Sequence, residues 1–266
     1  MSQEGIYLRR YELPKGLRYS TLKERREFYK EEFDLKRVHD WLKELKAKPV
    51  FAVIIGRHTK LYPRKYRADA STTILIDEYT GLEDVRSQIV EFLPESVYYD
   101  RNVYDEEGRI LGQELAFDLD PENLTCPIHG TLADKMKRFQ GLSFCELELR
   151  MVEDETVRLR ELLSETFSRI RVVYSGRGFH IHVFDKDAFK WSRRQREELG
   201  DDLRKRGFHI DEWVTSGGMR LIRLPYSLHG MVSRIVTPLE AGEVAGFNPV
   251  TDRRCLPRFL GDPISS

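Results

Sequence analysis

The sequence predicts an α+β fold built on an antiparallel or mixed sheet, and three observations support that class. Apolar and β-branched runs of strand length recur along the 266 residues. Segments with apolar residues at helical spacing lie between some of these runs. Because the two patterns do not alternate strictly, a sheet made of repeated βαβ units is not expected. The length allows a sizeable core, and we expect one domain over residues 1–266.

The N-terminal half begins with a helical region and continues with strands. Residues 20–45 are predicted to be helical, with a serine or threonine available as the N-cap. The runs at 49–56 and 71–77 predict strands, and apolar residues at helical spacing predict a helix at 81–93. Residues 96–120 contain one strand, a glycine turn and a second strand that ends in two aspartates.

The C-terminal half has the same mixed character. A long predicted helix at 146–168 is followed by two predicted strands, at 169–175 and 178–185. A polar helix at 192–207 ends at a glycine, and two further strands are expected at 219–225 and 234–239.

The composition excludes several classes of protein. The chain is 33% charged and 40% hydrophobic, as is typical of a globular domain. Its formal net charge is zero, so no overall basicity points to nucleic acid, although a neutral total can contain a basic cleft beside an acidic one. Three cysteines are too few for a disulfide scaffold. Because we find neither a signal peptide nor an apolar run of membrane-spanning length, we expect a cytoplasmic protein without a membrane partner.

Two aspartates one residue apart end the segment QELAFDLD. Side chains alternate along a strand, so the apolar residues would point one way and Asp118 and Asp120 the other. Two carboxylates this close repel each other, and burial would raise the pKa of at least one of them. A hard cation with oxygen ligands is the simplest compensation. The alternative is a solvated strand end with two exposed acids.

A second candidate segment is YSGRGFHIH. Gly176 and Gly178 flank Arg177 between two strands, where exposed backbone N–H groups and small residues let an anion approach. The guanidinium of Arg177 offers a fork of donors suited to phosphate oxygens. His180 and His182 share one face of the following strand. The alternative is a glycine-rich hairpin with a surface arginine and packed histidines.

The third candidate segment, DEWVTSGGMRLIRLPYSLHG, begins at Asp211. A flexible SGG sequence follows this carboxylate, and the next strand carries Arg220 and Arg223. Ser227 and His229 lie just past a proline. The alternative is that these are surface charges and a loop histidine.

Together, the three segments predict one site with the groups that nucleotidyl transfer requires, although the residues alone do not distinguish a polymerase from another phosphoryl-transfer enzyme. Asp118, Asp120 and Asp211 could hold two divalent ions. The groups available for a triphosphate are Arg177, Arg223 and His229, with His180 and Ser175. In such a site one ion lowers the pKa of an attacking 3′-hydroxyl and the other stabilises the leaving pyrophosphate, while basic side chains offset the phosphate charge.

The order of these motifs resembles the small catalytic subunit of archaeo-eukaryotic DNA primase. The pattern is D-x-D, then S-G-R-G-x-H, then D-x-x-V-[ST] followed by R-L-[IL]-[RK]-x-P-x-S-x-H. The matching residues are Asp118, Asp120, Ser175, Gly176, Arg177, Gly178, His180, Asp211, Val214, Thr215, Arg223, Pro225, Ser227 and His229. The segments REFYKEEF, VYYDRNVYD and GFNPVTD extend the resemblance over most of the chain.

The resemblance implies a function and a role for each matching residue. Asp118, Asp120 and Asp211 would be catalytic and bind Mg²⁺ or Mn²⁺. The residues that would contact nucleotide phosphates are Ser175, Gly176, Arg177, His180, Arg223 and His229. The chain would then be a DNA primase, a DNA-directed RNA polymerase-type nucleotidyltransferase. It would make short primers from nucleoside triphosphates on single-stranded DNA, with a large primase subunit as its partner.

Two departures from the family pattern matter. Some archaeal relatives carry an aspartate where this chain has SGG, so Asp211, just upstream, is our choice for the third carboxylate. It precedes WVT, a β-prone segment that strand pairing would fix, and Glu212 would face the other side. The other acids in the interval are Asp185, Asp187, Glu197, Glu198, Asp201 and Asp202. Second, residues 186–210 have space for about one helix, so the large helical insertion common in the family is not expected.

A small zinc-binding excursion is expected over residues 122–146. The residues with ligand spacing, C-x₂-H…C, are Cys126, His129 and Cys145. Primase small subunits are similar in carrying a zinc knuckle between the first two motifs. A structural zinc needs four ligands, and Asp134, Glu146 or another nearby oxygen could be the fourth. The alternative is two buried thiols and a surface histidine.

Three other activities are consistent with the sequence. A primase-polymerase or end-joining repair polymerase of the same superfamily would extend DNA, and the missing insertion favours it. A non-catalytic nucleic-acid-binding subunit would keep the fold, but the intact motifs argue against it. A two-metal phosphohydrolase would release phosphate or cut DNA without synthesis.

Overall fold

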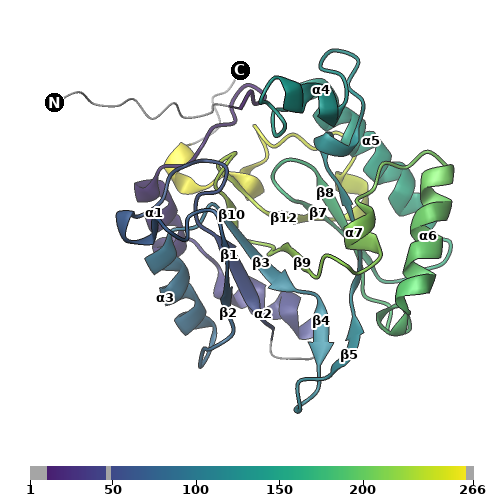
Figure 1. The fold of residues 1–266 in the computed structure, drawn as a ribbon, viewed down its shortest axis with the longest axis horizontal. Coiled ribbons are helices and arrows are strands. Elements are labelled where there is room, and N and C mark those ends of the chain that lie inside the picture. The colour runs from purple at the N-terminus through teal and green to yellow at the C-terminus, as the bar shows by residue number, and fades with distance from the viewer. Residues whose placement is uncertain (1–10, 46–48, 262–266) are drawn as a thin grey trace.

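The computed structural model describes residues 11–45 and 49–261, which form helices and antiparallel strands (Figure 1). The helices are α1 (Leu22–Glu31), α2 (Leu35–Leu42), α3 (Leu82–Phe92), α4 (Leu132–Lys137), α5 (Glu146–Leu163), α6 (Arg193–Lys205) and α7 (Glu212–Thr215). The strands are β1 (Phe51–Ile54), β2 (Thr73–Ile76), β3 (Ser96–Asp100), β4 (Asn102–Tyr104), β5 (Ile110–Gln113), β6 (Leu115–Leu119), β7 (Ile170–Tyr174), β8 (Phe179–Val183), β9 (Leu221–Arg223), β10 (Leu228–His229), β11 (Arg234–Ile235) and β12 (Thr237–Leu239). Two four-stranded antiparallel sheets, β2-β1-β3-β9 and β12-β7-β8-β6, organise the fold, so the α+β prediction is confirmed.

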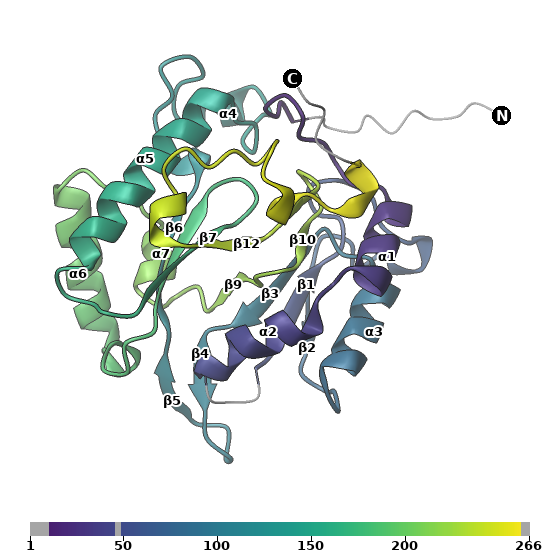
Figure 2. The same cartoon turned by 180° about the vertical axis from the view of Figure 1, so that it is seen from behind.

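The first core lies between the sheet β2-β1-β3-β9 and the helices α1, α2 and α3, and it extends to the second sheet through Ala116 and Val173 (Figure 2). Phe28 of α1 and Trp41 of α2 pack in one cluster with Val53 of β1. The helical region predicted at 20–45 is two helices, because the Asp34 side chain accepts an N–H group of α2 and starts a second helix there.

The second core lies between α5 and the sheet β12-β7-β8-β6. Leu115, Phe117 and Leu119 of β6 are at most 2% exposed and pack in this core. Ala116, between them, belongs to the first core. The predicted alternation along β6 is therefore confirmed, and its face opposite to α5 carries the aspartates.

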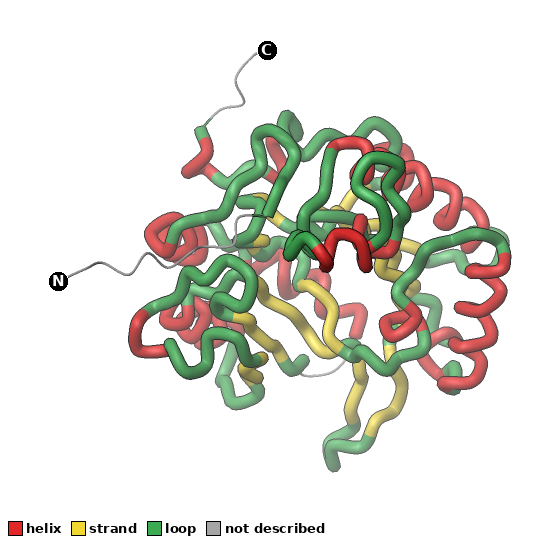
Figure 3. The backbone as a smooth tube through the Cα atoms, turned by 45° about the horizontal axis from the view of Figure 1, so that its top comes forward, coloured by secondary structure: helices red, strands yellow, loops and turns green. Residues whose placement is uncertain are grey.

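The chain passes between the two sheets in a way that brings distant motifs together. The β4–β5 hairpin, which turns at Gly108 with φ of +79°, leads from β3 of the first sheet to β6 of the second. After β8, the helices α6 and α7 lead back to β9, which pairs with β3. The strands of both sheets lie towards the middle of the molecule, with most helices outside them (Figure 3). The third motif therefore faces the first two from a different sheet.

Two predictions about the C-terminal half have different outcomes. Residues 186–210 contain a short 3₁₀ turn and α6, so the absence of a large helical insertion is confirmed. The single strand predicted at 234–239 is wrong: β11 pairs with β10 and β12 pairs with β7, so the run divides between two sheets. In the part of the chain that the structure describes, no helix is long and apolar enough to cross a membrane.

Candidate functional site

Asp118 and Asp120 lie at the end of β6, on the face opposite to the α5 core. In the β6–β8 ladder Asp118 is directly opposite His180, whose Nε2 lies 3.5 Å from Asp118 Oδ1. The two carboxylate side chains are 25% and 19% exposed, respectively. They are thus shielded from most water yet remain accessible to a ligand.

Burial and like charge raise the pKa of both carboxyl groups. Burial is the largest cause for Asp118, followed by the charges of Asp120 and Asp211. Burial also raises the pKa of Asp120, although the positive charge of Arg177 opposes the shift. A divalent cation among these oxygens would offset the repulsion, so the donor set fits a hard cation.

Asp211 reaches this pair through the backbone and not through strand pairing. Its N–H group donates to the carbonyl oxygen of Asp118 at 3.0 Å. The predicted strand after it is wrong, because Asp211 Oδ1 accepts two backbone N–H groups of the short helix α7, at 2.8 and 3.4 Å, and acts as its N-cap. Glu212 points to α6, where it pairs with Arg204.

All but one of the other acids considered for the third position have partners elsewhere. Asp185 accepts the backbone N–H groups of Ser168 and Arg169 at 3.1 and 2.8 Å. The acids of α6, each paired with an arginine of this helix or of its C-cap, are Glu197, Glu198, Asp201 and Asp202. Asp187 lies at the start of the 3₁₀ turn before α6. Asp211 therefore stays our choice for the third carboxylate.

The S-G-R-G turn approaches two other segments so closely that its glycines leave no space for a side chain. Gly176 has a φ of +112°, and a Cβ atom there would lie 2.4 Å from His229 Cδ2. A Cβ atom on Gly178 would lie 2.1 Å from the carbonyl oxygen of Leu119. Ser175 closes the turn by accepting the Gly178 N–H at its Oγ, at 3.3 Å. The turn is thus held between the end of β6 and the third motif.

Arg177, in this turn, pairs with carboxylates. Its Nη2 lies 2.5 Å from Asp120 Oδ1 and 3.0 Å from Glu122 Oε2. Burial lowers the pKa of Arg177, whose side chain is 8% exposed, but Asp120 and Glu122 raise it more, so its pKa lies above the ordinary value. Sequence reasoning selected Arg177 for phosphate and missed Glu122.

The third motif supplies Arg223 and His229 from a different part of the fold. Arg223 is opposite Tyr98 in the β3–β9 ladder, and its guanidinium lies 5.0 Å from the centre of that ring and donates to the hydroxyl at 3.3 Å. His229, on β10, is 4% exposed. Burial, followed by the charges of Arg223 and Arg177, holds the pKa of His229 well below its usual value, so the imidazole is neutral at physiological pH.

Unpaired buried polar atoms gather at the predicted site residues. Eight buried side-chain nitrogen and oxygen atoms lack a hydrogen-bond partner within the described residues, and five of them belong to this set. They are Asp118 Oδ1, Arg177 Nε, His180 Nδ1, Arg223 Nη1 and His229 Nδ1. Such atoms are costly to bury unless a ligand or water completes their hydrogen bonds. Their convergence from three motifs indicates a site for a polar ligand.

Two basic residues near the site were not predicted. Arg101 is fully buried, and its Nη2 donates to the carbonyl oxygens of Val214 (2.8 Å) and Met219 (2.5 Å), which holds α7 in place. His58 follows β1; burial lowers its pKa, and the charge of Arg177 lowers it further. The signal for His58 in the sequence was the Arg-His pair directly after the apolar run FAVIIG.

His182 shares a strand face with His180, as predicted, but it belongs to a buried hydrogen-bond network. Its Nδ1 lies 2.5 Å from Glu114 Oε1, and Glu114 Oε2 accepts the hydroxyl of Tyr99 at 2.8 Å. The His182 ring stacks on Phe184. This network lies between the two sheets and supports the strand that presents His180.

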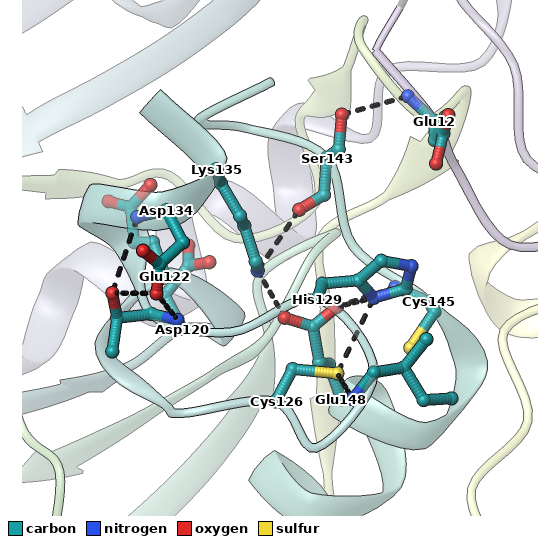
Figure 4. A network of polar contacts seen from close by, with 12 residues as sticks. Glu12, Asp120, Glu122, Cys126, His129, Asp134, Lys135, Ser143, Cys145 and Glu148 are labelled. Atoms are coloured by element: carbon teal, nitrogen blue, oxygen red, sulfur yellow. Dashed lines mark hydrogen bonds and ion pairs between the residues drawn. The ribbon is translucent and has the colours of Figure 1, made fainter. Parts of the chain in front are cut away.

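A second cluster, between β6 and α5, has zinc-ligand chemistry (Figure 4). Its members are Cys126, His129, Cys145 and Glu148, whose ligand atoms all lie within 4.8 Å of one another. Cys126 Sγ lies 3.4 Å from His129 Nδ1 and accepts the N–H group of Ile128 at 3.4 Å. Two thiols, an imidazole and a carboxylate match the number and type of donors in a tetrahedral zinc site.

Glu148 is the fourth member of this cluster, and Asp134 and Glu146 are not. Asp134 forms a capping box with Thr131 at the start of α4, and Glu146 is exposed at the first position of α5. Glu148 is buried, accepts the backbone N–H of Cys145 at 2.9 Å, and pairs with Lys135 (Figure 4). The signal in the sequence was a glutamate three residues after a cysteine, which is capping-box spacing.

Comparison with known proteins gives a consistent set of relatives. Residues 117–208 match the sequence profile of the family described as DNA primase small subunit. An Archaeoglobus fulgidus protein named "Uncharacterized DNA primase small subunit-like protein" is 49% identical, over 94% of each chain. The DNA primase small subunit PriS of Pyrobaculum aerophilum is 26% identical, over 62% of this chain and 66% of that protein. That of Pyrococcus horikoshii is 29% identical, over 69% of this chain and 49% of that protein. The matches thus span about half to two thirds of these two PriS proteins.

The fold has a relative among solved structures. The polymerase domain of Mycobacterium tuberculosis Ligase D, in complex with DNA, superposes with a TM-score of 0.53, over 96% of this chain and 92% of that one. At 14% identity this likeness concerns the fold alone. The profile match covers the first two motifs, and the 49% identical relative extends over nearly the whole sequence. The chain belongs to the DNA primase small-subunit family.

Proposed function

We propose that this chain is a primase-type nucleotidyltransferase that joins nucleoside triphosphates into short primers on a single-stranded DNA template. One observation carries the proposal: carboxylates and unpaired buried basic groups from β6, the S-G-R-G turn and β9–β10 converge at one place. Membership of the DNA primase small-subunit family supports the same class of reaction.

Asp118, Asp120 and Asp211 are our candidates to hold two divalent cations, Mg²⁺ or Mn²⁺. The unpaired Oδ1 atom of Asp118 and its raised pKa support this assignment, since both reflect a carboxylate that lacks a counter-ion. Cations held there would lower the pKa of an attacking 3′-hydroxyl and offset the charge of the leaving pyrophosphate.

The basic groups are our candidates to bind the triphosphate, in two different ways. Arg177 and Arg223 carry a positive charge, whereas burial holds the pKa of His180 and His229 well below the usual value. The two imidazoles are therefore neutral at physiological pH, and each offers a single N–H donor. Ser175 and Gly176 shape the turn that presents Arg177. This combination would orient the phosphates by hydrogen bonds and offset their charge through the arginines.

The cluster of Cys126, His129, Cys145 and Glu148 is our candidate for one structural zinc. Four protein ligands leave no open coordination position for a substrate, unlike a catalytic zinc site. The ion would tie the turn after Cys126 to the first turn of α5.

The proposed reaction also implies partners and a location. Template contacts mainly to phosphates would make binding weaken with salt. A large primase subunit would be the protein partner, and residues 1–266 would form one catalytic domain. An enzyme that primes DNA replication would be located inside the cell, at the nucleoid.

A second candidate is a polymerase of the same superfamily that extends an existing strand. Two observations favour it: residues 186–210 carry α6 in place of a helical subdomain, and the chain shares its fold with a ligase-associated polymerase domain bound to DNA.

Unprimed and primed templates distinguish the two candidates. The protein is incubated with each template, labelled ribo- or deoxynucleotides, and Mg²⁺ or Mn²⁺. Template-dependent product on unprimed DNA identifies a primase, whereas product on primed DNA alone identifies an extending polymerase. No product on either template, or phosphate release without synthesis, would contradict both.

A further inference from the structure

Glu122 is a carboxylate at the candidate site to which no motif assigns a role. It lies in the 3₁₀ turn Pro121–Asn123, directly after Asp120. Its Oε2 lies 3.0 Å from Arg177 Nη2, and the same nitrogen lies 2.5 Å from Asp120 Oδ1. One nitrogen of Arg177 is thus shared by two carboxylates, and one of these is a candidate cation ligand.

The three side chains differ in their freedom. Arg177, Asp120 and Glu122 are 8%, 19% and 35% exposed, respectively. Pro121, between the two acids, is buried and holds the backbone of the turn. Arg177 Nε is buried without a partner, so this arginine has a donor that neither carboxylate uses. Glu122 is the most exposed of the three and has the longer carboxylate side chain, so it can follow a movement of the guanidinium.

Arg177 and a cation would compete for Asp120. Both are positive, and both need the same carboxylate. A buried guanidinium that loses its carboxylate is strongly destabilising. Arg177 can therefore release Asp120 to a cation at low cost only if a second anion holds it.

We propose that Glu122 is a positioning residue that retains Arg177 when Asp120 turns to a divalent cation. Without the cation, Arg177 pairs with both Asp120 and Glu122. When the cation is bound, Arg177 pairs with Glu122 alone. Glu122 thereby keeps the guanidinium beside the site, with Nε free for a nucleotide phosphate. Glu122 acts through Arg177 and contacts neither the substrate nor the cation. This inference rests on the proposed function, because it takes Asp120 as a cation ligand.

Binding of Mn²⁺ to the full chain, followed by electron paramagnetic resonance, tests the proposal without any turnover. The proteins are the unchanged chain, Glu122→Gln, Arg177→Gln and the double variant. We expect Glu122→Gln to raise the Kd for Mn²⁺ about tenfold, because Arg177 then keeps Asp120. In the Arg177→Gln background, Glu122→Gln should alter the Kd for Mn²⁺ less than about threefold, because no guanidinium then competes with Mn²⁺ for Asp120. Glu107→Gln removes an acid that pairs with Arg109 on the β4–β5 hairpin, and should change nothing.

Two outcomes of the double-mutant cycle would overturn the proposal. If Glu122→Gln weakened Mn²⁺ binding equally strongly with and without Arg177, Glu122 would be a direct cation ligand. If Glu122→Gln weakened Mn²⁺ binding equally slightly with and without Arg177, Glu122 would act only as a distant charge. If Arg177→Gln does not fold, a salt series on the unchanged chain and Glu122→Gln gives a second test. The loss of Mn²⁺ affinity in Glu122→Gln should persist at high salt. A loss that high salt abolishes would mean that Glu122 acts only through a long-range electrostatic field.

Asp118→Asn separates this inference from the proposed function. If Asp118→Asn abolishes Mn²⁺ binding while the cycle shows no coupling, only the role of Glu122 is wrong. If Asp118→Asn binds Mn²⁺ as the unchanged chain does, the proposed cation site itself is wrong.

Discussion

The carboxylate site and the cysteine cluster both carry metal-ligand chemistry, but their side chains are arranged differently. In the cysteine cluster, four ligand atoms already lie within 4.8 Å of one another, and a backbone N–H group donates to Cys126. In the carboxylate site, Arg177 pairs with Asp120, and five buried polar atoms have no partner among the described residues. In our proposal an ion alone would complete the cysteine cluster, whereas the carboxylate site would take both a cation and a polar ligand. This is the difference expected between a structural ion and one that works with a substrate.

The largest expected effect is loss of synthesis in Asp118→Ala and Asp120→Ala. We expect at least a 10³-fold decrease, on the order of what the removal of a metal ligand or of strong electrostatic stabilisation costs. Both proteins should fold, and the cation-free Asp118 variant should melt slightly higher, because like-charge repulsion at this buried carboxylate is relieved. Near-normal primer synthesis in both variants would remove the metal assignment.

The next effect concerns the third carboxylate and has a matched control one residue away. Asp211→Asn should reduce activity about 100-fold through loss of charge, while asparagine still caps α7 and leaves the melting temperature nearly unchanged. Glu212→Gln removes one exposed pair with Arg204 and should cost less than about threefold. The reverse ranking would place the third ligand elsewhere.

Arg177→Ala and His229→Ala should raise the apparent KM for nucleotide. Each should cost about 2–4 kcal/mol of transition-state stabilisation, as expected for a lost contact in a preorganised site. Arg194→Ala, which removes an exposed arginine paired with Glu198, is the control and should match the unchanged chain. An effect confined to template affinity would contradict the phosphate role.

The cysteine cluster should affect stability more than chemistry. Protein purified without chelators should contain one zinc per chain, and Cys126→Ser with Cys145→Ser should lose it and lower the melting temperature by about 5 °C or more. Glu148→Gln should weaken zinc binding more than Glu146→Gln, because only Glu148 lies in the cluster. Absence of zinc in the unchanged protein, or zinc retained without both thiols, would contradict this site.

The prediction from alternation along β6 was accurate. Alternation along a strand is a local property, and it placed Asp118 and Asp120 on the face of β6 away from the α5 core. The convergence of the three motifs came from the order of the motifs and the family resemblance, because spacing alone does not show that β9 pairs with β3.

The sequence did not predict features that depend on distant partners. WVT has strand-forming residues, yet Asp211 caps a helix there and Arg101, between β3 and β4, holds that helix in place, so tertiary contacts override local propensity. Glu148 was missed because its burial beside Lys135 depends on how α4 and α5 pack. Glu122 was missed because an exposed acid after a strand is ordinary until Arg177 is found 3.0 Å away.

The most direct test of the central claim is a crystal structure of the protein with Mn²⁺ and a non-hydrolysable nucleoside triphosphate, in which anomalous scattering locates the manganese. We expect manganese at Asp118 and Asp120, and a triphosphate that contacts the unpaired buried nitrogens of Arg223 and His229. Manganese and nucleotide bound elsewhere, with these carboxylates unliganded at saturating concentrations, would contradict the account.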